Sequence, residues 1–147
     1  RRNGAGAALR YWKRKSGTPE HIDFRMTSRA AWERDYRPLL LGVDRRRLNI
    51  ETSRDALARR RASGRWALAG QMFVWELMRQ SMGDVCMYES LALDPAWIHD
   101  YNRVYTDFYK AHWSVLLDEA GAPDGFRMCE DLGYRNGLFC SPECSRR

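Results

Sequence analysis

The sequence lacks any apolar run of membrane-spanning length, and it contains few histidines, prolines and cysteines. No stretch approaches the roughly 18 consecutive apolar residues that a transmembrane helix needs. The basic start, Arg1-Arg2, leads into no apolar segment of the kind found in secretory signals. These absences predict a soluble cytoplasmic protein with no membrane partner. The 147 residues, 44% hydrophobic and 30% charged, exclude wholesale disorder and favour about one globular domain.

Cysteine is absent from the first half of the chain, and the four cysteines of the second half form no Cys-x-x-Cys pair. This distribution argues against a disulfide-rich secreted scaffold. Cys140 and Cys144 could supply two zinc ligands. His99 or His112 would have to complete such a site, and the spacing matches neither ribbon nor finger patterns. We therefore interpret these cysteines as buried or tail thiols and expect no metal site in this chain.

Positive charge is concentrated in the first half of the chain. Residues 1–65 carry 18 basic and 7 acidic side chains, whereas residues 66–147 carry 7 basic and 12 acidic ones. The basic runs are Lys13-Arg14-Lys15, Arg45-Arg46-Arg47 and Arg59-Arg60-Arg61, which could contact nucleic acid, another polyanion or acidic lipid. Arginine makes up 22 of the 25 basic residues, which indicates compositional bias. We therefore favour solvated helix faces and disfavour a nucleic-acid partner.

Residues 1–64 are predicted to form a basic, mostly helical lead-in. Residues 1–10 show no hydrophobic period and are expected to be frayed. Thr27-Ser28 can cap a helix that stops before Pro38, and Thr52-Ser53 precedes a second helix. These segments contain few apolar residues, so they are expected to pack on a larger unit.

From Arg65 onward the pattern indicates a strand, helical segments and a second strand. The apolar run Trp66–Gly70, bounded by glycines, predicts a buried strand. Apolar residues from Met72 to Leu91 predict two short helices. Phe126–Cys129 predicts the second strand, which a right-handed crossover would set parallel to the first.

A long amphipathic helix is predicted between these strands. Asp94 and Pro95 are typical of a helix start, because the carboxylate can cap and proline needs no N–H at the first position. Apolar residues then recur at intervals of three and four up to Gly121. The residues expected to be buried are Tyr101, Tyr105 and Phe108, and those expected toward solvent are Asn102, Arg103 and Lys110.

A polar cluster, Glu130-Asp131-Leu132-Gly133-Tyr134, stands where the second strand should end. Sites of (β/α)8 barrels lie at the carboxyl ends of the strands. The pattern therefore predicts an α/β fold, a partial TIM-type (β/α)8 barrel with a helical N-terminal lead-in. Glu130 and Asp131 are the best catalytic candidates, although alternation lets at most one of them point into the barrel mouth. A carboxylate that only fixes the loop is the competing interpretation.

Several motifs resemble the uroporphyrinogen decarboxylase superfamily, in particular its bacterial branch with a Glu-Asp-x-Gly-Tyr-x-x-Gly loop. They are Gly83–Glu89, Leu93–Asp100, Pro123–Gly125 and Glu130–Gly137. The resemblance implies that residues 65–147 are the first part of such a barrel, which needs about 250 residues. We therefore expect an incomplete fragment that is inactive alone and can self-associate through its open barrel edge.

The resemblance also implies a cofactor-free carboxy-lyase acting on a tetrapyrrole or another small molecule. It places Asp131 beside the substrate as the catalytic residue, with Glu130 and Tyr134 as further substrate-binding residues. Met78 and Arg79 are included because they stand where authentic decarboxylases carry a substrate-facing tyrosine. Two alternatives remain open. One is a corrinoid-dependent methyltransferase relative, in which zinc activates a thiol, and the other is a non-catalytic basic interaction module.

Overall fold

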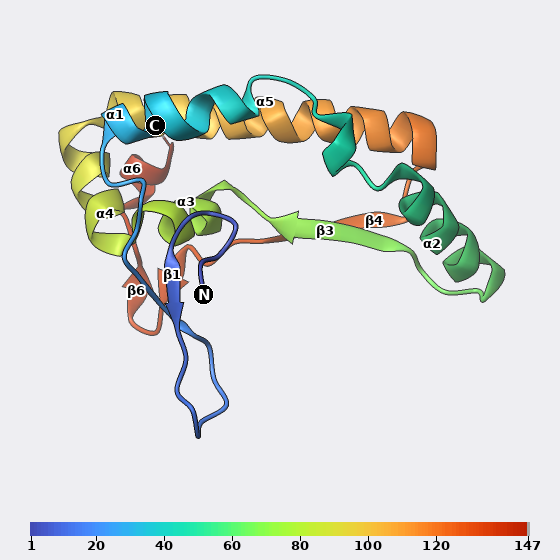
Figure 1. Ribbon diagram of the computed structural model, residues 1–147, viewed down its shortest axis with the longest axis horizontal. Coiled ribbons are helices and arrows are strands. Elements are labelled where there is room, and N and C mark those ends of the chain that lie inside the picture. The colour runs from blue at the N-terminus through green and yellow to red at the C-terminus, as the bar shows by residue number, and fades with distance from the viewer. Residues whose placement is uncertain (147) are drawn as a thin grey trace.

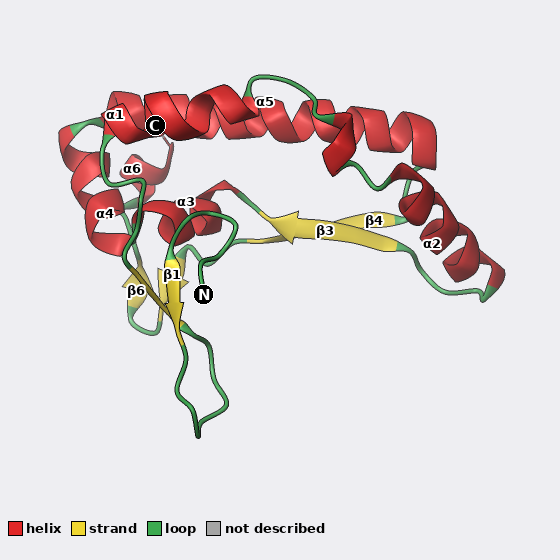
Figure 2. Ribbon diagram, viewed as in Figure 1, coloured by secondary structure: helices red, strands yellow, loops and turns green. Residues whose placement is uncertain are grey.

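The computed structural model, in which residues 1–146 are described, combines helices with three two-stranded sheets (Figures 1 and 2). The strands are β1 (Ala8–Arg10), β2 (Glu20–Ile22), β3 (Leu68–Met72), β4 (Gly125–Cys129), β5 (Gly133–Tyr134) and β6 (Gly137–Leu138). The helical segments are α1 (Arg29–Ala31), the π-helical turn η1 (Trp32–Tyr36), the 3-10 turns η2 (Arg37–Leu40) and η3 (Arg45–Arg47), α2 (Ile50–Ala62), α3 (Val74–Met82), α4 (Asp84–Leu93), α5 (Pro95–Ala120) and α6 (Pro142–Arg146).

The lead-in is less helical than the sequence predicts. The first ten residues were expected to be frayed, but they enter an antiparallel hairpin in which Arg10 of β1 lies opposite Glu20 of β2 and forms an ion pair with it. Ser28 caps α1 as expected, accepting a hydrogen bond from the Ala31 N–H at 3.2 Å. The helical run that carries Trp32 and Tyr36 ends at Tyr36, before Pro38 as expected, and the separate 3-10 turn η2 follows with Pro38 in its first turn, where an N–H is not required.

The parallel strand pair predicted for the second half is confirmed. β3 and β4 pair in parallel, with Leu68 opposite Gly125, and α3, α4 and α5 connect them. β3 begins two residues later than expected, because its pairing with β4 begins at Leu68, whereas Trp66 is 72% exposed. The order of elements was therefore correct, whereas the strand boundary and the expected burial of the strand were not, since Leu68 is 60% and Met72 39% exposed.

The long helix α5 is confirmed with both of its ends. The Asp94 side chain accepts a hydrogen bond from the Trp97 N–H at 3.2 Å, and Pro95 occupies the first helical position. Gly121 ends the helix at a φ of 97°, which favours glycine. Tyr101 is fully buried, and the rest of the predicted face, Tyr105 and Phe108, is half-buried.

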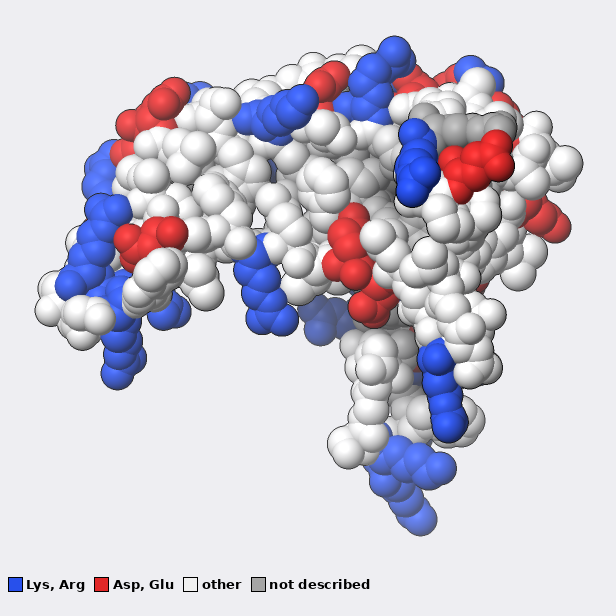
Figure 3. All heavy atoms as spheres, turned by 180° about the vertical axis from the view of Figure 1, so that it is seen from behind, with Lys and Arg blue, Asp and Glu red and all other residues white. Residues whose placement is uncertain are grey.

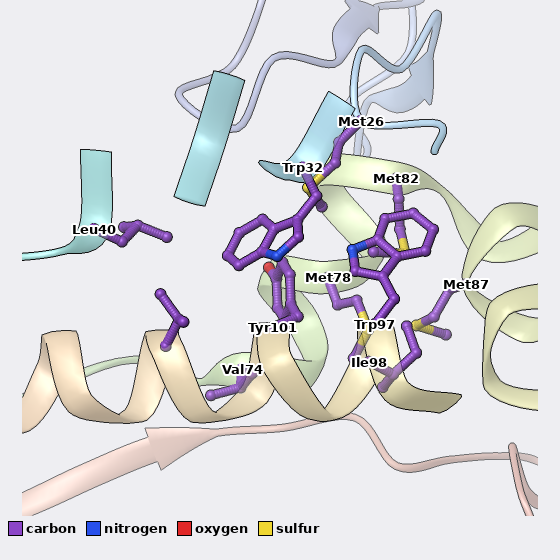
Figure 4. Packing of buried hydrophobic residues seen from close by; sticks show 11 residues of the cluster. Met26, Trp32, Leu40, Val74, Met78, Met82, Met87, Trp97, Ile98 and Tyr101 are labelled. Carbon is purple, nitrogen blue, oxygen red and sulfur yellow. The ribbon is translucent and has the colours of Figure 1, made fainter. Parts of the chain in front are cut away.

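The core lies between α5, the α3–α4 pair and the lead-in. Met26, Trp32 and Leu40 of the lead-in join residues of α3, α4 and α5 in one cluster (Figure 4). Figure 4 shows the Trp32 ring against that of Tyr101, with ring centroids 4.9 Å apart. Residues 1–64 and residues 65–146 therefore share this core.

No described sheet has more than two strands, so residues 1–146 form no closed barrel. The β3/β4 pair leaves one face open. The parallel register and the alternation of side chains place Leu68, Met72 and Arg127 on that face and Phe126 on the other. On the Phe126 side the ring of Trp113 of α5 packs edge-on against the Phe126 ring, with ring centroids 4.8 Å apart. Leu68 is 60% exposed. Parallel sheets are ordinarily covered on both faces, and each strand of this pair also has an unpaired outer edge. Self-association through the open barrel edge stays a prediction.

Asp100 of α5 connects the long helix to the lead-in. Its carboxylate accepts hydrogen bonds from Trp32 Nε1 at 2.9 Å, Arg37 Nε at 2.9 Å and Arg103 Nη2 at 2.7 Å. Burial by itself would raise the pKa of Asp100, but these three donors outweigh it and lower the pKa to about 2.

Stability is therefore expected to depend on the ionisation of Asp100. Its folded pKa lies below the value of about 3.9 in an unfolded chain. Its contribution, about 2 kcal/mol, is thus complete above that unfolded value and is lost as the pH falls through the folded one. Urea unfolding should show Asp100→Asn to be less stable than wild type by about this amount near pH 7, with the gap closing toward about pH 2. Asp107→Asn, at an exposed site on α5, is the control. A gap of equal size at both pH values would contradict the assignment.

Candidate functional site

The carboxyl end of the β3/β4 pair opens onto a cavity of about 920 Å³. α3, α5, α6 and the loop after β4 enclose it, and its volume is in the range of small-molecule sites. Its wall combines apolar Met78, Ile98 and Leu132 with polar His99 and Glu130. Asn102 also lines it and is half-buried, which corrects the expectation that this side chain faces solvent.

Glu130 ties the end of β4 to the start of α3. Its Oε1 accepts a hydrogen bond from the Trp75 N–H at 3.1 Å, and its Oε2 accepts one from the Glu76 N–H at 3.0 Å. The first N–H groups of a helix have no partner within the helix, and Phe73, at the N-cap position of α3, offers no side-chain acceptor. The Glu130 carboxylate therefore caps α3 from a distant part of the chain, at the end where a negative charge is stabilised.

The environment of Glu130 perturbs its ionisation. Burial raises the pKa of Glu130, and the hydrogen bonds from the Trp75 and Glu76 N–H groups oppose this effect. The nearby negative charges of Glu76 and Asp131 raise it further. The result is a half-buried carboxyl group of raised pKa in the cavity wall, a combination found at acid–base sites and also in structural networks.

Asp131 points elsewhere. It is exposed, it does not line the cavity, and within residues 1–146 its side chain makes no hydrogen bond or ion pair. The two adjacent carboxylates therefore diverge. Glu130 turns toward α3 and the cavity, and Asp131 turns toward solvent.

Arg79 and Tyr134 belong to a second group, around the ring of Phe139. The Arg79 guanidinium carbon lies 4.8 Å from the Phe139 ring centroid, and the Tyr134 centroid lies 5.6 Å from it. Arg79 also binds Glu76 at 3.0 Å and Asp84 at 2.9 Å. Its charge is thus already compensated, and an anionic ligand would have to displace these carboxylates. Of the residues predicted as substrate-binding, only Glu130 and Met78 line the cavity, and Met78 is otherwise a core residue, 1% exposed.

An aromatic cluster, of which Trp75 lines the cavity, was not predicted from the sequence. Trp75, Tyr88 and Phe139 lie with ring centroids 6.1 to 6.5 Å apart. Trp75 Nε1 and Tyr88 Oη are buried and have no hydrogen-bond partner in the described part of the chain. Unpaired buried polar groups of this kind cost about 1–3 kcal/mol each. The helical spacing of apolar residues in α3 predicts that Trp75 lies on its apolar face. No local sequence pattern predicts that Phe139 packs beside it.

No three His, Cys, Asp or Glu side chains among residues 1–146 come together in a way that could hold a metal ion. The zinc ligand set considered for Cys140 and Cys144 is therefore not assembled by these residues. No helix in the same range is long and apolar enough to cross a membrane.

Comparisons with models of protein families, with curated proteins and with solved structures give no match to this chain. Function is therefore inferred from the geometry of the cavity and of the loop after β4.

Proposed function

We propose that this chain provides a small-molecule site of the uroporphyrinogen decarboxylase type and that its ligand is a tetrapyrrole. The observation that carries the proposal is that the cavity, with Glu130 in its wall, lies at the carboxyl end of a parallel strand pair, and that Asp131 follows directly outside it. In (β/α) barrels the ligand site lies at this end of the strands. A partial barrel that begins with β3 and β4 is part of the same proposal.

In this proposal Asp131 is the ligand-binding carboxylate. An exposed carboxylate without a protein partner can accept charge-assisted hydrogen bonds from pyrrole N–H groups. Those bonds orient the ring while one acetate arm loses carbon dioxide and a proton takes its place, without a cofactor. Glu130 is the positioning residue, because its two backbone hydrogen bonds hold the start of the loop against α3.

The acidic arms of a tetrapyrrole need hydrogen-bond donors. Trp75 lines the cavity, and its Nε1 is buried without a partner in the described chain. A ligand carboxylate at this position would remove the cost of that unpaired donor. Asp131 does not line the cavity, so the ligand would have to extend from the Trp75 donor in the cavity wall to the Asp131 acceptor outside it.

The test is a titration of the protein with uroporphyrin III, followed by the fluorescence of the porphyrin. Asp131→Asn keeps the shape and removes the charge, and losing a charge-assisted hydrogen bond should weaken binding by on the order of 10- to 100-fold. Asp118→Asn, at an exposed position of α5, is the matched control for the loss of one negative charge. The proposal fails if wild type does not bind the porphyrin, or if Asp131→Asn binds it equally well with an unchanged circular dichroism spectrum.

A further inference from the structure

The structure separates the basic runs of the first half by what their side chains bind. Arg45 pairs with Glu119 at 2.6 Å, and Arg46 and Arg47 pair with Asp44 at 2.9 and 3.6 Å. This run is therefore held by acidic side chains of the same molecule.

The run at the end of α2 is partly held. Arg61 donates a hydrogen bond to the Ala122 carbonyl oxygen at 2.7 Å, and Arg54, which precedes Arg61 by about two helical turns on the same face, donates to the Glu119 carbonyl oxygen at 2.7 Å. These two guanidinium groups hold α2 against the end of α5 by hydrogen bonds. Their donors are therefore engaged within the protein.

Lys13-Arg14-Lys15 differs from both. It lies in the loop between β1 and β2, residues 11–19, called the hairpin tip below. In the described chain its three side chains make no ion pair or side-chain hydrogen bond, and the hairpin tip contains no acidic residue. The nearest carboxylate along the chain, Glu20, is already paired with Arg10. Three positive charges thus stand uncompensated.

The hairpin tip also exposes two large aromatic rings. Tyr11 is 57% exposed and Trp12 is 67% exposed, immediately before the basic run. The hairpin projects away from the helices (Figure 1), and Lys and Arg side chains occupy the end of that projection (Figure 3). Adjacent exposed rings followed by unpaired cations are the two components of a single-strand binding surface, where bases stack and phosphates pair with the cations.

We propose that the hairpin tip binds single-stranded nucleic acid, with Tyr11 and Trp12 stacking on bases and Lys13-Arg14-Lys15 contacting phosphates. This site is separate from the cavity and does not depend on the proposed tetrapyrrole function. Composition alone disfavours a nucleic-acid partner for the whole chain, but it cannot show that one basic run is exposed beside two aromatic rings.

The arrangement fits a nucleic acid better than a membrane surface. The middle of the loop, residues 13–18, holds only Lys, Arg, Ser, Gly and Thr. An interfacial segment buries its apolar and aromatic side chains in the membrane boundary, whereas here the cations occupy the middle of the loop and Tyr11 and Trp12 lie next to β1. A single strand lying along the hairpin can reach both groups.

The first test uses a fluorescently labelled oligouridylate of about 12 nucleotides, long enough for one such site, and measures its anisotropy with the whole chain. The triple variant K13A/R14A/K15A should bind at least tenfold more weakly, and the slope of log affinity against log salt should fall by about 2, since each phosphate contact contributes about 0.7. R45A/R46A/R47A removes the same charge from a run that is already paired. Its affinity should stay close to that of wild type.

The second test separates stacking from charge. Trp12→Ala should weaken binding by about fivefold or more without changing the salt slope, because base stacking on an aromatic ring is not ionic. Trp66→Ala removes an equally exposed ring, 72% exposed and outside the hairpin, and should have no effect.

Four outcomes overturn the proposal, provided that the circular dichroism spectra of the variants match wild type. They are no binding by wild type, equal losses in the two triple variants, equal affinities of Trp12→Ala and wild type, and tip-dependent binding to phosphatidylserine vesicles without binding to the oligonucleotide. The last outcome would assign the hairpin tip to an anionic lipid surface.

Discussion

Replacing Trp32 by alanine is expected to lower the free energy of unfolding by about 3–5 kcal/mol, the cost of truncating a large buried aromatic side chain. Trp32 is fully buried, and its ring centroid lies 4.9 Å from that of Tyr101 and 6.0 Å from that of Tyr105. Its Nε1 also donates to Asp100, so the variant leaves part of that carboxylate unpaired. Urea unfolding followed by circular dichroism measures the loss.

Two further variants make the Trp32 result specific. Trp32→Phe keeps most of the packing and removes the hydrogen bond to Asp100, so it should cost less than the alanine variant. Trp66→Ala, at a 72% exposed position, should change stability by no more than about 0.5 kcal/mol. If Trp32→Ala were no more destabilising than Trp66→Ala, the lead-in would not be part of the core.

Gly83→Ala is expected to destabilise the protein by about 3 kcal/mol, since it combines backbone strain of about 1–3 kcal/mol with a steric clash. Gly83 joins α3 to α4 at a φ of 78° and a ψ of 160°, a conformation essentially restricted to glycine. A Cβ there would lie 2.6 Å from Cε2 of the Phe24 ring. The change would therefore disturb both the turn and the contact that the lead-in makes with it.

Gly17→Ala is the matched control for this prediction. Gly17 has no positive φ, and a Cβ there would meet no atom within 4 Å. Chemical denaturation should therefore place Gly17→Ala close to wild type or slightly above it. Equal stabilities of the two alanine variants would show that the turn at Gly83 is not strained by a side chain.

Local chemistry explains why the second half could be predicted from the sequence. The Asp94 cap, Pro95 and the terminal Gly121 each act within one turn of the residue itself, and the structure confirms all three. The two apolar runs predicted the parallel strands for the same reason. The boundary at Trp66 was wrong because pairing with β4, and not local hydrophobicity, determines where β3 begins.

The lead-in was predicted less well because its structure depends on partners distant in sequence. β1 has no hydrophobic period, and its pairing with β2 is accompanied by the ion pairs of Arg10 with Glu20 and of Arg2 with Asp23. The burial of Trp32 depends on α5, which lies far along the chain. Patterns within a short window cannot report such contacts.

The sequence by itself determined the order of elements from β3 to β4, both ends of α5 and the position of a carboxylate pair directly after the second strand. Only the tertiary structure decided what each carboxylate does. Glu130 faces α3 because the Trp75 and Glu76 N–H groups, 55 and 54 residues earlier, need an acceptor. Asp131, one residue later, is exposed and lies outside the cavity lining. The cavity and the aromatic cluster likewise arise where segments distant in sequence meet, which no spacing along the chain encodes.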